Sequence, residues 1–98
     1  MRPQVRENVF RWANDIKRDI HEGKPPRVVA LFLTMDVARD YLASGGYHVY
    51  RGRLSMGGEG LRVVNRYCCE ELEKLGRITP DEKTAILKAT AEDIRHVG

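Results

Sequence analysis

The sequence predicts an all-α fold, a small bundle of three or four helices in one domain that covers residues 1–98. Apolar residues recur at intervals of three and four along most of the chain, which is the period of an α-helix with one buried face. Glycine and proline residues divide the chain into separate segments. One of these segments opens on a helix-start motif, Thr79-Pro80-Asp81-Glu82.

The first segment, from Pro3 to His21, carries a single apolar stripe at helical spacing. A proline suits the first turn of a helix, and Gly23 suits the left-handed residue that follows the last turn. We therefore predict a helix over this range. The stripe consists of Val5, Val9, Trp12, Ala13, Ile16 and Ile20.

Two structures are compatible with the second segment, PPRVVALFLTMDVARDYLASGG. As a helix, it begins at Pro25 and Pro26 and ends at Gly45. As a strand, residues 27–34 form a buried apolar run whose partner would be residues 47–54. The helix is favoured because an isolated pair of strands is only marginally stable. The strand alternative would make the protein α+β.

The third and fourth segments predict an antiparallel helical hairpin. The third runs from Met56 to Leu75, and the glycines in its first turn can leave that turn open as a loop. Gly76 ends the third segment, and the fourth begins at Pro80 after the Thr79 cap. The expected buried faces hold Leu61, Val64, Cys68, Leu72 and Leu75 in the third segment and Ile86, Leu87, Thr90, Ile94 and Val97 in the fourth.

Composition narrows the class of protein. Hydrophobic residues make up 42% and charged residues 32%, as in globular domains. The longest apolar run is far shorter than the ~20 residues that cross a bilayer, and no apolar stretch follows the charged N-terminus. We therefore expect no membrane association, no signal peptide and a cytoplasmic location. Because so small a domain buries limited surface, we also expect a homo-oligomer.

The basic residues favour particular partners. The net charge is +3, with twelve arginines against five lysines. Arginine is preferred where phosphate or carboxylate is held by two parallel hydrogen bonds, although a GC-rich genome produces the same bias. A DNA-reading helix-turn-helix at the hairpin is disfavoured, because the acidic pair Asp81 and Glu82 would face the phosphates.

No residue pattern indicates an enzyme, a metal site or a cofactor. The acidic residues are spread over helix surfaces, within reach of Lys or Arg one turn away. No Ser–His or Cys–His spacing indicates a nucleophile. The adjacent Cys68 and Cys69 have no further ligands at zinc-site spacing, so we expect them to be reduced, partly buried and apolar in character.

The strongest functional signal is GGYHVYRGRLSMGGEG, residues 45–60. Aromatic faces stack on bases, arginine pairs with phosphate, and the N–H groups of a helix start attract anions. The alternative interpretation is that Tyr47, Val49 and Leu54 simply pack this connection onto the bundle. The predicted ligand-binding residues are Tyr47, His48, Tyr50, Arg51, Arg53, Ser55, Gly57 and Gly58.

Two hypotheses for function follow. The first is a non-enzymatic protein that captures a phosphate-bearing ligand, namely a nucleotide, a cyclic nucleotide or a nucleic acid, through residues 45–60. The second is a protein–protein interaction module that acts as a homo-oligomer, of the kind that phages and mobile elements encode as inhibitors or adaptors of host proteins. Its expected aromatic anchors are Phe10, Trp12 and Phe32, with Trp12 equally suited to the core.

Overall fold

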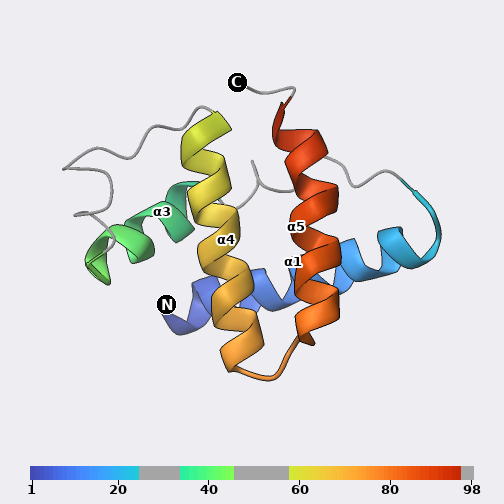
Figure 1. Ribbon diagram of the computed structural model, residues 1–98. Coiled ribbons are helices and arrows are strands. Elements are labelled where there is room, and N and C mark those ends of the chain that lie inside the picture. The colour runs from blue at the N-terminus through green and yellow to red at the C-terminus, as the bar shows by residue number, and fades with distance from the viewer. Residues whose placement is uncertain (25–33, 46–57, 96–98) are drawn as a thin grey trace.

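The computed structural model describes residues 1–24, 34–45 and 58–95, and these segments form an all-α bundle (Figure 1). The helices are α1 (Pro3–His21), α3 (Thr34–Ala43), α4 (Gly58–Lys74) and α5 (Pro80–Arg95). The predicted fold class is therefore confirmed, and no strand occurs in the described segments. The choice between helix and strand for residues 27–33 and 47–54 lies outside them.

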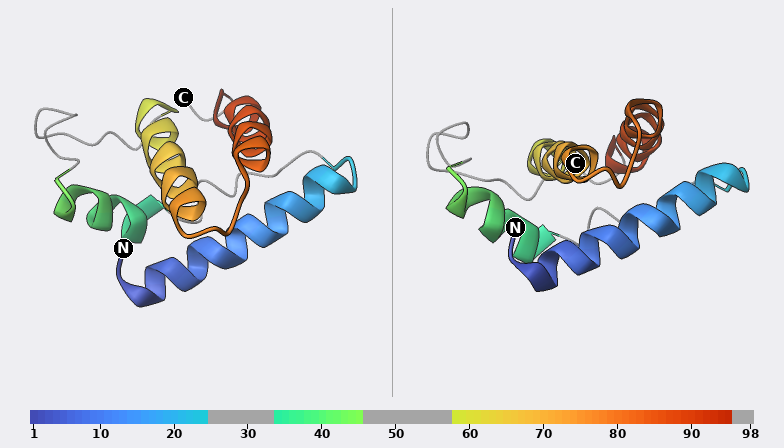
Figure 2. Two further views of the ribbon diagram at one scale, coloured as in Figure 1. Left: turned by 60° about the horizontal axis from the view of Figure 1, so that its bottom comes forward. Right: turned by 90° about the horizontal axis from the view of Figure 1, so that it is seen from below.

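The helices are arranged in two layers. α4 and α5 lie side by side and antiparallel, and α1 crosses the hairpin that they form (Figure 2). α3 packs against α4 on the side away from α5. None of the described helices combines the length and the apolar character that crossing a bilayer requires.

Helix α1 follows its sequence pattern closely. Pro3 occupies the first position, and the buried stripe runs from Val5 to Ile16. After the last turn, Gly23 has a φ of 74°, and the N–H of Lys24 donates to the carbonyl of Asp19 at 2.9 Å. This backbone arrangement is a common helix end that requires a left-handed residue. The predicted bounds and stripe of this helix are confirmed.

The hairpin between α4 and α5 is fixed by the expected capping residues. The Thr79 N–H donates to the Glu82 carboxylate at 2.9 Å, and the Glu82 N–H donates to the Thr79 hydroxyl oxygen at 3.1 Å. Gly76, with a φ of 70°, ends α4. These contacts satisfy N–H groups that the first turn of α5 would otherwise leave unpaired.

Helix α4 differs from its prediction at both ends. Its regular structure begins at Gly58, two residues after the predicted start at Met56, so part of the glycine-rich first turn is helical, with Gly60 buried. At the other end, α4 stops at Lys74, and Leu75 leaves the buried stripe. The side chain of Leu75 is 43% exposed, because the chain turns away from the bundle one residue later.

The core lies where α1 crosses the hairpin. Leu72 and Ile86 are fully buried there together with Val9 and Ile16. Cys68 and Cys69 are also fully buried and unpaired, and burial raises the pKa of Cys69 to about 12 and that of Cys68 further. A thiol with so high a pKa is neutral at physiological pH, so both cysteines pack as small apolar groups.

One buried polar contact joins α4 to α5. The Asn65 side-chain amide donates to the Thr90 hydroxyl oxygen at 2.6 Å, and the Thr90 hydroxyl donates to the Ile86 carbonyl at 2.7 Å. Thr90 was expected on the buried face, whereas Asn65 was not. This contact favours one register of the two helices, because a shift would leave the buried Asn65 amide without its partner, while Thr90 would keep its bond to the Ile86 carbonyl within α5.

Candidate functional site

An open groove of about 500 Å³ lies between the first turns of α1 and the turn that joins α4 to α5. We call it the Phe10 groove. Since α1 crosses the hairpin near this turn, residues far apart in the sequence meet along one edge of the molecule. Its lining residues are Pro3, Gln4, Arg6, Glu7, Phe10, Leu75 and Arg77.

Phe10 and Arg77 form the centre of the groove. Phe10 is half-buried and packs against the core, so its ring is held in place from below. The guanidinium carbon of Arg77 lies 4.0 Å from the centroid of that ring. This is a cation–π contact, and the N–H groups of the guanidinium that do not face the ring remain available to a partner.

Lys17 holds the backbone of Arg77 in place. Its ammonium group donates to the Arg77 carbonyl at 3.3 Å and also pairs with the Glu82 carboxylate at 3.5 Å. Both contacts join α1 to the start of α5. The groove is therefore supported by polar contacts as well as by the apolar core.

The floor of the groove is solid. Beneath it, Val9 and Leu72 are closely packed with Phe10 and Leu75, and the space between them does not admit a water molecule. Leu75 lies at the surface of the groove, and among the described residues it is the large hydrophobic side chain that is exposed. Aromatic residues and arginine are enriched at protein interfaces, and here they lie beside an exposed leucine.

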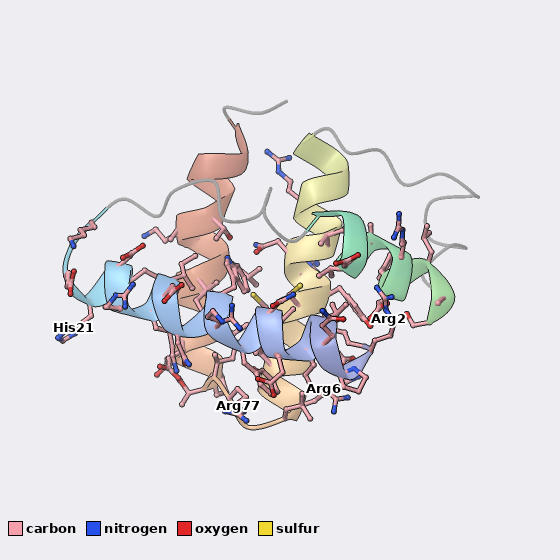
Figure 3. All side chains as sticks on the ribbon, turned by 180° about the vertical axis from the view of Figure 1, so that it is seen from behind. Arg2, Arg6, His21 and Arg77 are labelled. Carbon is pink, nitrogen blue, oxygen red and sulfur yellow. The ribbon has the colours of Figure 1, made fainter. Side chains whose placement is uncertain are left out.

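The charges of the groove are unequal. It contains two arginines, Arg6 and Arg77, against one carboxylate, Glu7. Within residues 1–24, 34–45 and 58–95, none of these three side chains makes an ion pair. Figure 3 shows Arg6 and Arg77 along the same edge of the molecule, with His21 at the far end of α1. The groove thus offers two cationic groups to a partner.

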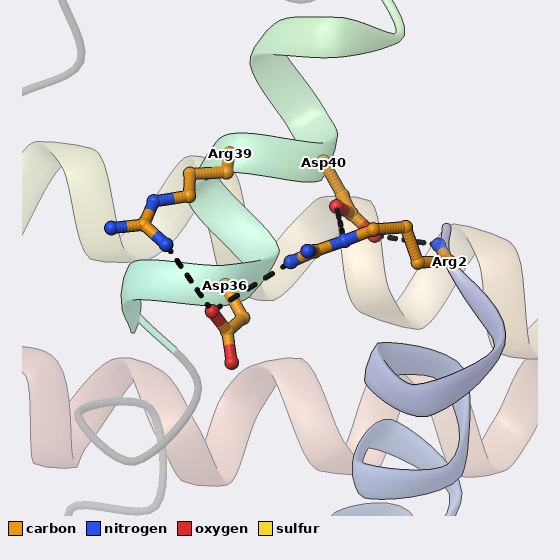
Figure 4. A network of polar contacts seen from close by, with 4 residues as sticks. All are labelled: Arg2, Asp36, Arg39 and Asp40. Carbon is orange, nitrogen blue, oxygen red and sulfur yellow. Dashed lines mark hydrogen bonds and ion pairs between the residues drawn. The ribbon is translucent and has the colours of Figure 1, made fainter.

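A network at one end of the groove anchors the start of α1 to α3 (Figure 4). The Arg2 backbone N–H donates to one oxygen of the Asp40 carboxylate at 2.6 Å, and the Arg2 Nε–H donates to the other at 2.7 Å. Asp36 lies 3.7 Å from the Arg2 guanidinium and 3.8 Å from that of Arg39. Because Arg2 directly precedes two lining residues, this network helps to fix the groove wall.

The ionisation of Asp40 reflects two opposing effects. Burial of this carboxyl group would raise its pKa, since only 8% of the residue is exposed. The hydrogen bonds from Arg2, together with the charges of Arg2 and the N-terminal ammonium group, outweigh burial and hold the pKa of Asp40 below its ordinary value. Asp40 is therefore a carboxylate throughout the physiological pH range.

The predicted site residues have different outcomes. Phe10 lines the groove, and Gly58 is the first residue of α4. Trp12 lies in the core with 3% exposure and contributes no surface to the groove. The other predicted residues lie outside the part of the chain that the structure describes, namely Phe32, Tyr47, His48, Tyr50, Arg51, Arg53, Ser55 and Gly57.

Sequence reasoning missed Arg6, Leu75 and Arg77. Arg6 and Arg77 were not among the predicted site residues, and Leu75 was placed on a buried helix face. The sequence contained one signal for Leu75. This residue immediately precedes Gly76, which was expected to end the helix, so it is the last residue that the buried face of that helix can include. The meeting of these residues with Phe10 depends on how α1 crosses the hairpin, which periodicity does not reveal.

No protein family, no curated protein and no solved structure matches this chain. Function is therefore argued from the residues and geometry of the site.

Proposed function

We propose that this protein is a non-enzymatic binding protein that contacts a partner protein through the Phe10 groove, as an adaptor or an inhibitor of that partner. The observation that carries the proposal is the exposed Leu75 beside the stacked Phe10–Arg77 pair. Aromatic residues and arginine supply much of the binding energy at interfaces, and a rigid apolar floor lowers the entropic cost of binding.

The residues that line the groove give no similar support for a catalytic function. Its ionisable side chains are two arginines and one glutamate, and none of them is buried. In the described part of the chain, no group of three or more His, Cys, Asp or Glu side chains could hold a metal ion. The groove offers exposed apolar surface and fixed charge, which suit recognition of another protein.

We also propose a cytoplasmic location and a homo-oligomer. Two unpaired cysteines fit a reducing compartment. Self-association would use a surface outside the Phe10 groove, leaving the groove accessible to the partner. Light scattering gives the oligomeric state directly.

The proposed contact surface predicts that Leu75→Ser removes peptide binding. A random peptide library is displayed on phage and selected on the wild-type protein. We expect selected peptides to bind Leu75→Ser at least ~5-fold more weakly, because truncation of a side chain that contributes to an interface costs more than ~1 kcal/mol. Titration calorimetry measures the affinities, and circular dichroism confirms that the variant is folded.

The matched control is Leu42→Ser. It removes the same side chain from α3, which does not line the groove. Peptides should bind this variant as they bind the wild type. A library that yields no Leu75-dependent peptide would contradict the proposed function.

A phosphate-bearing ligand held by residues 45–60 is the second candidate. It is supported by the start of α4 at Gly58, since glycine-rich backbone at a helix start is suited to anions. A nucleotide at ~100 times its dissociation constant should raise the free energy of unfolding by about 2.7 kcal/mol. The gain should disappear in the double variant Arg51→Ala/Arg53→Ala, and a panel of nucleotides, cyclic nucleotides and oligonucleotides without any effect would exclude this candidate.

A further inference from the structure

We infer that the partner of the Phe10 groove is an acidic segment of another protein, in which a large apolar side chain is flanked by carboxylates. This inference rests on the proposed function and adds the chemistry of the partner. The apolar side chain would lie against Leu75 and Phe10, and the carboxylates would meet Arg6 and Arg77.

The first step concerns the orientation of Arg77. The guanidinium carbon lies 4.0 Å from the centroid of the Phe10 ring, so this group is positioned before any partner arrives. Carboxylates bind guanidinium along the edge, where two N–H groups donate in parallel. Arg77 is therefore held where its N–H groups can donate to a carboxylate, next to the exposed apolar side chain of Leu75.

The second step concerns the balance of charge. Arg6 is half-buried on the groove wall, and among the described residues neither Arg6 nor Arg77 pairs with an acidic side chain. Elsewhere on α1, Lys17 and Arg18 have carboxylate partners, whereas Arg11, which is exposed outside the groove, forms no ion pair with a described residue. The groove therefore contains positive charge that the carboxylates of a partner would neutralise.

The third step separates this partner from two others. A two-fold contact between copies would place the groove of one copy against the groove of the other. Four arginines would then face only two glutamates, which is an unfavourable balance of charge. A nucleic acid would pair its phosphates with the arginines but would leave Leu75 without an apolar contact. An acidic segment with an apolar side chain satisfies the arginines and covers the leucine.

The test uses the Leu75-dependent peptides from the library selection. We expect them to carry a net negative charge and at least one large apolar residue. Replacing their Glu and Asp by Gln and Asn should weaken binding to the wild-type protein about 10-fold, because hydrogen bonds to charged groups are the stronger ones. Binding of the acidic peptides should also weaken as salt is raised, since the charges lie at the surface.

Variants of the protein identify the arginine responsible. In Arg77→Gln, the preference for the acidic peptide should fall, and in the double variant Arg6→Gln/Arg77→Gln the acidic and the neutralised peptides should bind with nearly equal affinity. The control Arg66→Gln removes the same charge from an exposed position on α4 outside the groove, and it should retain the preference for the acidic peptide.

The outcomes are distinguishable. Leu75-dependent peptides that are neutral or basic would overturn the acidic partner while leaving the proposed function in place. A dimer that dissociates in Leu75→Ser would also overturn it, because a second copy would then cover the groove. If no peptide depends on Leu75, the proposed function itself fails.

Discussion

Replacing Leu72 by alanine is expected to lower the free energy of unfolding by about 2–5 kcal/mol. Leu72 is fully buried where α4 meets α1, and it lies beneath the Phe10 groove. Its truncation removes apolar contacts and leaves a cavity that closely packed neighbours fill only in part. Since domains are stable by ~5–15 kcal/mol in total, this single change removes a large share of the stability. Urea denaturation followed by circular dichroism measures the loss.

The control for this prediction lies three residues further along the chain. Leu75→Ala makes the same chemical change at a side chain that is 43% exposed. We expect it to change the free energy of unfolding by less than about 1 kcal/mol, because little buried surface is lost. Equal losses in the two variants would mean that the end of α4 at Lys74, and with it the exposure of Leu75, is wrong.

Replacing Asp40 by asparagine is expected to lower the free energy of unfolding at pH 7 by about 2 kcal/mol, the typical worth of hydrogen bonds to a charged group. The carboxylate of Asp40 is 7% exposed and accepts two hydrogen bonds from Arg2. Its loss frees the first turn of α1 from α3. Because that turn lines the Phe10 groove, peptide binding should weaken as well.

The effect of Asp40→Asn should depend on pH. The pKa of Asp40 is lowered in the folded protein, whereas in the unfolded chain it has the ordinary value of about 3.9. The stabilisation is therefore fully present above about pH 5 and is lost as the pH falls through the lower, folded-state pKa. The difference in unfolding free energy between wild type and variant should shrink between about pH 5 and pH 3.

Asp36 provides the matched control for this network. It also lies near Arg2, but its side chain is 57% exposed and its contacts are 3.7 and 3.8 Å long. Asp36→Asn should change the unfolding free energy by no more than about 0.5 kcal/mol. A difference for Asp40→Asn that stays constant down to pH 3 would show that its carboxylate does not stabilise the fold through its charge.

Local signals made much of the fold predictable. The stripe of α1 repeats over about four turns, and Pro3 and Gly23 mark the two ends of the helix. At α5, Thr79 and Glu82 form a motif whose residues are only three positions apart. Such features depend on the backbone within one turn, so the sequence alone is sufficient to locate them.

The candidate site depends on contacts between distant parts of the chain. Phe10 and Arg77 come from opposite ends of the sequence, and the contact between Arg2 and Asp40 spans 38 residues. These pairs form only when α1 crosses the hairpin and α3 packs against α4. The number of helices and their buried faces do not determine that crossing, because the ridges of helices pack at several preferred angles.

The most direct test of the Phe10 groove is a nuclear magnetic resonance titration of isotope-labelled protein with the tightest-binding peptide from the library. We predict that backbone amide shifts change mainly at residues 4–10 and 75–77, on the two walls of the groove. The same titration of Arg77→Gln should show smaller changes at the same positions. Shift changes centred on residues 46–57, or on α3, would contradict the groove as the contact surface.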